Sequence, residues 1–181
     1  VPSWVGEPRE ELQQRMKSKE KFTTPLSCPF ITHWLYNMTH DQVLDMLKYL
    51  GMGNRPEDNV KVIFVPCYLD GKDGILNKAY YDLILGSDLS VYPSYYEPWG
   101  YTPLESVAFH VPCVTTTLAG FGMWANSVKG GDSTIMDGVE VIRRTDYNYS
   151  EVADRIKETV SNFSNLTEKE VEEVRKKAKK L

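Results

Sequence analysis

Two glutamates, Glu97 and Glu105, flank a short run rich in aromatic residues, proline and glycine, with seven residues between them. Because Pro98 follows Glu97 directly, it pushes that residue toward an extended backbone, so the carboxylate sits on a stiff stretch of chain. Glu97 is either a solvent-exposed acid or a group that contacts a ligand. A glycoside hydrolase also uses two carboxylates, although a proline-stiffened glutamate that leads into a helix does not favour that chemistry.

The segment after the first glutamate predicts the start of a helix. Thr102 is in place for the N-cap, Pro103 for the first helical position, and Glu105 for the closing carboxylate of a capping box. Glu105 is then either that capping group alone or a ligand-binding group as well. The free amides of Gly100, Tyr101 and Thr102, together with the helix dipole, would attract a phosphate.

These residues lie between predicted strands at 89–92 and 113–117. Upstream, the pattern predicts strands at 30–35 and 60–65, the second buried on both faces, and helices at 39–51 and 77–86. Strands that alternate with helices indicate an α/β fold with a parallel sheet and helices on both faces. Ligands bind outside the carboxyl ends of such strands, which predicts that Tyr68, Glu97 and Gly120 share one rim.

Further elements are predicted at both ends of the chain. Leu12 and Met16 lie at helical spacing after Pro8, and downstream the sequence predicts a strand at 139–143 and helices at 149–163 and 167–180. Glycines 120 and 122 would let the backbone approach a ligand closely. The aromatic cluster beside the glutamates is either packing or a ligand platform, and its members are Tyr95, Tyr96, Trp99 and Tyr101.

Composition narrows the class of protein. Lys and Arg total 21 against 25 Asp and Glu in 181 residues, for a net charge of -4, which argues against a dedicated nucleic-acid binder. The sequence has no apolar run of membrane-spanning length and no signal segment. Cys28, Cys67 and Cys113 are widely spaced and odd in number, as expected of reduced thiols, so we predict a cytoplasmic protein.

Two features look like sites but favour a structural interpretation. The run D-G-K-D-G at 70–74 lacks the remaining ligands of a calcium loop and predicts a turn. His33 stands alone at a strand end, where a hydrogen-bonded structural group is the favoured interpretation and a ligand contact the alternative. The sequence therefore predicts no metal site.

The runs Y-P-S-Y-Y-E-P-W-G-Y-T-P-L-E-S and V-P-C-V-T-T-T-L-A-G-F-G resemble the glycogen synthases of the animal and fungal type. The upstream runs T-H-W-L-Y-N, V-K-V-I-F-V-P and I-L-N-K-A-Y-Y-D are similar to the same family. The resemblance covers roughly Pro25 to Trp124.

This resemblance implies the C-terminal half of a GT-B glycosyltransferase, in which two Rossmann-like domains face each other across a cleft. Residues 1–24 would be a helical lead-in and 25–181 the Rossmann-like domain that holds the nucleotide sugar. The implied reaction transfers glucose from UDP-glucose to an α-1,4-glucan with retention at the anomeric carbon. Positioning and electrostatics carry such a reaction, so no cofactor beyond the donor substrate is expected.

The resemblance also implies site residues. Glu97 would lie beside the donor glucose and Glu105 would take the ribose hydroxyls. The turn at 100–102 would face the diphosphate. Tyr68, where the family has phenylalanine, and Tyr80 would flank the uracil.

Some parts of the family pattern are missing. The Arg and Lys that the family uses on the donor pyrophosphate precede this region, as does the acceptor-side domain, and no arginine-rich regulatory helix is present. Without these residues and the acceptor-side domain, we expect the chain to be inactive alone. Its lack of an initiator methionine fits a fragment of a longer protein. ADP-glucose as donor, or a non-catalytic module that binds glucan or a protein partner, remain alternatives, and the sequence leaves oligomeric state open.

Overall fold

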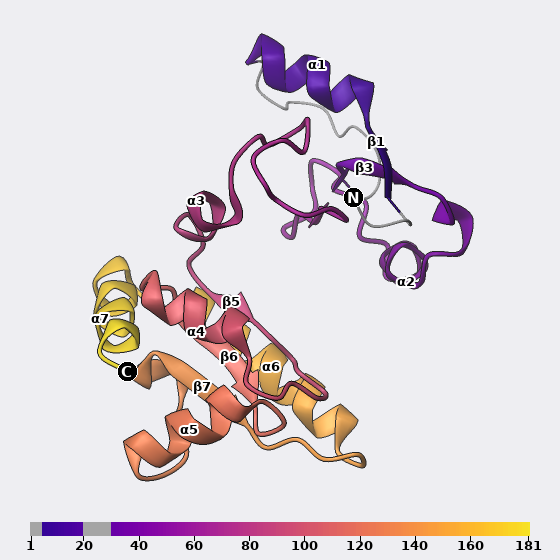
Figure 1. Ribbon diagram of the computed structural model, residues 1–181. Helices are drawn as coiled ribbons and strands as arrows, with labels where there is room; N and C mark the ends of the chain where they lie inside the picture. The colour runs from indigo at the N-terminus through magenta and orange to yellow at the C-terminus, as the bar shows by residue number, and fades with distance from the viewer. Residues whose placement is uncertain (1–4, 20–29) are drawn as a thin grey trace. The chain divides into compact units, whose positions relative to one another are not determined.

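The computed structural model describes residues 5–19 and 30–181, and its mixed helices and parallel strands confirm the predicted α/β class (Figure 1). The chain divides into two compact units, Val1–Tyr80 and Tyr81–Leu181. Each unit is described by itself below. None of the helices in the described ranges combines the length and the apolar character that crossing a membrane requires.

The second unit is built on a three-stranded parallel sheet. Its strands, in spatial order, are β5 (Ser90–Val91), β6 (Cys113–Thr116) and β7 (Val139–Ile142). Val114 of β6 pairs with Val91 on one side and with Glu140 on the other. Every residue of β6 and β7 is buried, as expected for strands that are covered by helices on both faces.

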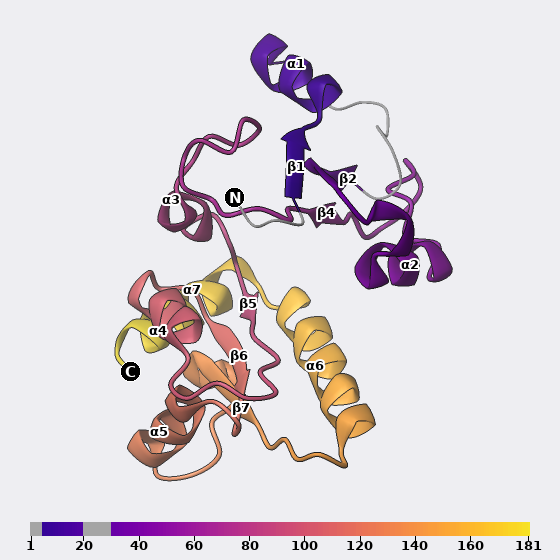
Figure 2. The ribbon, with the colours of Figure 1, turned by 45° about the vertical axis from the view of Figure 1, so that its right-hand side comes forward.

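Helices cover both faces of this sheet, as predicted (Figures 1 and 2). Phe121 and Ala178 pack on one face with side chains of the sheet, whereas Val152 and Phe163 pack on the other. The helices are α4 (Tyr101–Ala108), α5 (Gly120–Lys129), α6 (Tyr149–Ser164) and α7 (Glu168–Lys179), with a 3-10 turn, η2, at Ile135–Asp137. Thr167 and Glu170 form a capping box at the start of α7.

Gly120 and Gly122 lie in the first turn of α5, and backbone atoms of neighbouring segments occupy the space where their side chains would be. A Cβ on Gly120 would lie 2.5 Å from the Pro98 carbonyl oxygen, and one on Gly122 would collide with the Thr116 carbonyl oxygen. Both glycines therefore let backbone pack against backbone. They hold the loop before α4 and the end of β6 close to α5.

The first unit has shorter strands in two small sheets. β2 (Phe30–Ile31) pairs in parallel with β4 (Ile63–Phe64), and β1 (Val5–Pro8) pairs antiparallel with β3 (His33–Leu35). Around them lie α1 (Glu10–Ser18), α2 (Gln42–Tyr49) and the 3-10 turn η1 (Met38–His40). The helix α3 (Tyr80–Ile84) begins at the last residue of the first unit, and its other residues belong to the second unit. The helix after Pro8 and the helix that Asp41 caps are both as predicted.

Two expectations about this part of the chain are wrong. The strand predicted at 60–65 is not buried on both faces, because it shrinks to the two residues of β4. Phe64 packs against the core of this unit, but Ile63 is 63% exposed. The helix predicted at 77–86 begins only at Tyr80, since Asn77 has a left-handed φ of 51° and Asp73 accepts three amide hydrogen bonds from the turn before it.

Cys67 and Cys113 are free thiols, and Cys28 lies outside the described residues.

Candidate functional site

Backbone pairing holds Glu97 in place at both of its peptide groups. Its N–H donates to the Leu118 carbonyl at 3.0 Å, and its carbonyl accepts from the Gly120 N–H at 3.3 Å. The residue forms an isolated parallel bridge with Ala119, which confirms the predicted extended backbone. The side chain of Glu97 is exposed, so a rigid backbone carries a carboxylate that is open to solvent.

The helix after Glu97 begins two residues earlier than predicted. Gly100 is the N-cap of α4 with a left-handed φ of 95°, and Tyr101 is the first helical residue. Thr102 lies inside the first turn, so the predicted N-cap and its capping box with Glu105 are wrong. A left-handed N-cap favours glycine over any residue with a Cβ, and this backbone requirement overrides the side-chain pattern.

The shifted start leaves three amides at the tip of α4. The N–H groups of Gly100, Tyr101 and Thr102 donate to none of the described residues, as expected at the start of a helix. A Cβ on Gly100 would lie 3.5 Å from Cγ of Glu97, so this glutamate runs alongside the helix tip. Its carboxylate accepts no hydrogen bond from these amides. Gly100 itself is buried, whereas Tyr101 and Thr102 are exposed, so an anion can reach the tip at these two residues.

Glu105 lies in the second turn of α4 and has a partner that the sequence did not reveal. Its Oε1 accepts a hydrogen bond of 2.8 Å from the hydroxyl of Tyr81. This hydrogen bond, and then the charge of Glu105, raise the pKa of the Tyr81 phenol above its ordinary value. Tyr81 also stacks on Phe109 at the end of the same helix, with ring centroids 5.1 Å apart.

A second set of contacts ties the loop before Glu97 to the end of β7. The Tyr95 hydroxyl donates to Oδ1 of Asp146 at 2.7 Å, and the Arg144 guanidinium lies 5.1 Å from the centroid of the Tyr95 ring. Arg144 also donates to the Pro93 carbonyl at 2.6 Å. The hydrogen bond to Asp146 raises the pKa of Tyr95 above its ordinary value. These contacts could not be predicted from local residue patterns, since their partners are 51 residues apart.

The aromatic cluster at 95–101 divides between the two roles considered for it. Trp99 packs with Phe121 and Trp124, at centroid distances of 6.4 Å to each, and its carbonyl accepts from the Phe121 N–H at 2.6 Å. Tyr96 and Tyr101 instead are 78% and 68% exposed. The tryptophan fixes the loop, and these two tyrosines are open to a ligand.

The two remaining predicted residues, Tyr68 and Tyr80, belong to the first unit. The Tyr80 N–H donates to the carbonyl of Leu69 at 2.9 Å, beside an antiparallel bridge between Asp70 and Ala79, so the two tyrosines lie on paired segments. Tyr68 is 76% exposed and lines an open cavity of about 470 Å³.

His33 and Asp73 are structural groups, as predicted for the histidine and for the turn at 70–74. Nε2 of His33 lies 2.7 Å from the Asp73 carbonyl oxygen, which can only accept, so Nε2 carries a proton; Nδ1 lies 2.8 Å from Thr32 Oγ1. Burial opposes ionisation of the Asp73 carboxyl, but its amide hydrogen bonds outweigh burial and hold its pKa below the ordinary value. Across the described residues, no three His, Cys, Asp or Glu side chains are grouped so that they could hold a metal ion.

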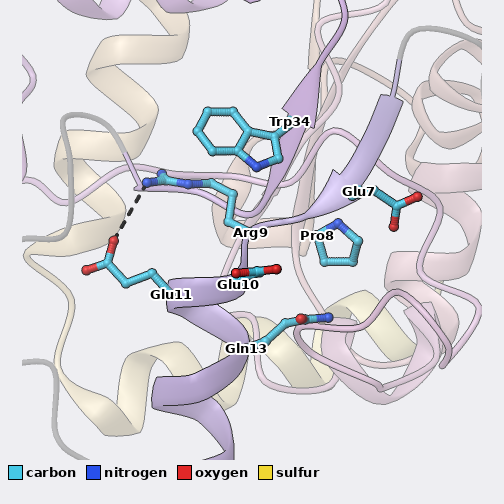
Figure 3. A pocket seen from close by; sticks show the side chains of 7 residues that line it. All are labelled: Glu7, Pro8, Arg9, Glu10, Glu11, Gln13 and Trp34. Atoms are coloured by element: carbon cyan, nitrogen blue, oxygen red, sulfur yellow. Dashed lines mark ion pairs between the residues drawn. The ribbon is translucent and has the colours of Figure 1, made fainter.

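A separate pocket of about 400 Å³ in the first unit contains none of the predicted site residues (Figure 3). The guanidinium of Arg9 lies 5.1 Å from the centroid of Trp34 and 3.9 Å from a carboxylate oxygen of Glu11. Arg9 also donates to the Ile31 carbonyl at 3.4 Å. These contacts join the start of α1 to β2 and β3, and the pocket is lined by Glu7, Pro8, Arg9, Glu10, Glu11, Gln13 and Trp34.

Comparison with known proteins agrees with the resemblance noted in the sequence. The family model for glycogen synthase matches residues 8–181. Glycogen [starch] synthase isoform 1 of Saccharomyces cerevisiae is 32% identical over 142 residues, which are 78% of this chain and 20% of the yeast protein. The Neurospora crassa glycogen [starch] synthase is 30% identical over 160 residues, which are 88% of this chain and 22% of that protein.

An animal relative gives a higher identity over a shorter stretch. The liver glycogen [starch] synthase of Homo sapiens is 42% identical over 94 residues, which are 52% of this chain and 13% of the human protein. The chain thus spans about a fifth of the length of the fungal relatives. Since the family model covers nearly all of the sequence, the chain belongs to the glycogen synthase family.

Proposed function

We propose that this chain is the donor-binding part of a retaining glucosyltransferase that moves glucose from UDP-glucose to an α-1,4-glucan. The observation that carries the proposal is the tip of α4, where three unpaired amides adjoin the exposed, backbone-clamped Glu97. A helix N-terminus with free amides binds phosphate. A fixed carboxylate next to it can accept hydrogen bonds from sugar hydroxyls.

In this arrangement the diphosphate lies against the amides of residues 100–102. The amides and the helix dipole stabilise the negative charge that grows on the diphosphate as it leaves. Glu97 orients the glucose, and Glu105 accepts hydrogen bonds from the ribose hydroxyls. Tyr68 and Tyr80 contact the base, which an aromatic ring can stack on whether it is uracil or adenine.

The loop contacts support the same role, because catalysis by positioning needs groups that do not move. Trp99 packs against the buried Phe121 of the second unit, and Tyr95 is tied to Asp146 and Arg144. Ligand binding then requires little ordering of the loop, which lowers its entropic cost.

Calorimetric titration of the chain with UDP, ADP and a maltooligosaccharide tests the donor role. We expect UDP to bind, and we expect Thr102→Pro, which removes one amide at the helix tip, to weaken it about tenfold. Glu151→Gln on α6 is the control and should bind UDP as the unchanged chain does. Tighter binding of ADP than of UDP would assign the donor to ADP-glucose, and binding of the oligosaccharide without any nucleotide would favour a non-catalytic glucan-binding module.

Transfer of labelled glucose from UDP-glucose to glycogen tests the catalytic role. We expect the 181-residue chain alone to transfer none. In a protein that carries the acceptor-side domain as well, Glu97→Gln should reduce turnover by about a hundredfold or more while thermal unfolding is unchanged. Turnover equal to that of the unchanged protein would refute the role of Glu97, and release of glucose from glycogen without nucleotide would favour a hydrolase.

A further inference from the structure

Tyr81 is the partner of Glu105 on the surface of the second unit. Its hydroxyl donates to Oε1 of Glu105 over 2.8 Å, and its ring stacks on Phe109 at an interplanar angle of 27°. Tyr81 comes from α3, whereas Glu105 and Phe109 are one turn apart on α4. The phenol is therefore held by ring stacking at one end and donates a hydrogen bond to the carboxylate at the other.

This contact restricts a side chain that would otherwise be mobile. A glutamate at a solvent-accessible position samples many rotamers, and ordering such a side chain on binding costs conformational entropy. Tyrosine has only two side-chain torsions, and stacking on Phe109 restricts both. The hydrogen bond from Tyr81 therefore orders the carboxylate of Glu105 before any ligand arrives.

The choice of a phenol matters for the charge at this position. An arginine or lysine would neutralise Glu105 and occupy the carboxylate with charged donors. A neutral phenol leaves the negative charge in place and uses only Oε1. In the described part of the chain, Oε2 accepts no hydrogen bond, so it can accept from the hydroxyls of a ligand.

We propose that Tyr81 is a positioning residue that pre-orients Glu105 to accept hydrogen bonds from the ribose hydroxyls of a nucleotide sugar. The proposal rests on the proposed function, in which Glu105 faces the ribose. Tyr81 itself is 46% exposed and touches the ligand through Glu105 only. Its contribution should thus be seen with ligands that carry ribose hydroxyls and vanish with ligands that lack them.

The test uses Tyr81→Phe, which removes the hydroxyl but keeps the ring on Phe109. Calorimetry would compare UDP with 2′,3′-dideoxyuridine diphosphate for the 181-residue chain and its variants. We expect Tyr81→Phe to weaken UDP about three- to tenfold and to leave the dideoxy ligand unchanged. Glu105→Gln should reduce the preference for UDP over the dideoxy ligand more than Tyr81→Phe does. Tyr49→Phe, at an 85% exposed tyrosine on α2, is the matched control and should change neither affinity.

Each other outcome overturns a different step. An equal loss for both ligands, or no loss for UDP, would refute the positioning role of Tyr81 while the proposed function stands. Equal affinity of the unchanged chain for UDP and for the dideoxy ligand would show that Glu105 does not contact the ribose hydroxyls. Failure to bind any nucleotide would overturn the proposed function and this inference with it. Melting curves would confirm that Tyr81→Phe is folded, and Phe109→Leu, which loosens the ring but keeps the hydroxyl, should give a smaller effect of the same kind.

Discussion

The parallel strands of the two units are buried to very different extents. In the second unit β6 has a neighbour on each side, and all residues of β6 and β7 are buried. Among the described residues of the first unit, β2 and β4 pair only with each other, over two residues, and Ile63 stays 63% exposed. A strand that has two partners and two helix layers loses its contact with water on both faces, whereas a lone pair keeps part of its apolar surface wet.

This difference matches the demands that the proposed function places on each unit. Amides and carboxylates must be held to within about 0.5 Å to act on a reacting centre, and residues 97–105 stand on the deeply packed unit. Stacking of a base on an aromatic ring tolerates small shifts and any base, and Tyr68 stands on the more open unit. The comparison leads to four predictions about stability.

The largest expected effect comes from the core of the second unit. Phe121 is fully buried, so Phe121→Ala should reduce the free energy of unfolding by about 3–5 kcal/mol, because it loses apolar contact and leaves a cavity. Ile63→Ala in the first unit should cost less than about 1 kcal/mol, since most of that side chain is already in water. Urea denaturation would measure both, and similar losses would contradict the difference in depth.

Glycines with left-handed φ give a second comparison. Gly138 has φ 93° and a Cβ there would collide with the backbone of Ala178, so Gly138→Ala should cost on the order of 3 kcal/mol through overpacking and strain. Gly51 in the first unit has φ 67° with nothing within 4 Å, so Gly51→Ala should cost about 1 kcal/mol, from backbone strain alone. Thermal melting of the two variants separates packing from strain, and equal shifts would mean that Ala178 moves away at little cost.

The Asp73 carboxylate makes the stability of the first unit depend on pH. Its pKa is lower folded than unfolded, so its contribution is complete above the unfolded value of about 3.9 and is lost as pH falls through the folded value. Asp73→Asn should therefore cost about 2 kcal/mol at pH 7, and the gap to the unchanged chain should narrow below about pH 4.

Hydrogen exchange followed by mass spectrometry at pH 7 would locate that loss. Faster exchange should be confined to the first unit, near the amides of Ile75, Leu76 and Asn77 that Asp73 holds. Asp132→Asn, an exposed position in the second unit, serves as the control. A loss spread evenly over both units would show that they unfold together.

The smallest expected effects come from helix caps, one in each unit. Asp41 accepts from the N–H groups of Val43 and Leu44 at the start of α2, and Thr167 caps α7. Asp41→Ala and Thr167→Ala should each cost about 1 kcal/mol. The two values should agree because a cap is a local contact, so a difference of more than about 1 kcal/mol would show that packing in the units reaches even the helix ends.

Local chemistry explains what could be predicted from the sequence. The α/β class, the helices α1, α2, α6 and α7 and the extended backbone of Glu97 follow from periodicity and from residues within a few positions of one another. The predictions failed where a distant or backbone contact decided the outcome. Gly100 replaced Thr102 as the N-cap of α4, and the single partner of β4 left a strongly apolar run half exposed.

Local sequence groups two glutamates, a proline, a glycine and a helix start along the chain, and it is this grouping that resembles the glycogen synthases. Which of their polar groups are left without partners depends on the tertiary fold. It pairs both peptide groups of Glu97 with the segment at 118–120, leaves the amides of the α4 tip open, and gives Glu105 to Tyr81, 24 residues earlier. The physical reason is that hydrogen bonds and packing between segments far apart in the sequence leave no trace in local residue patterns.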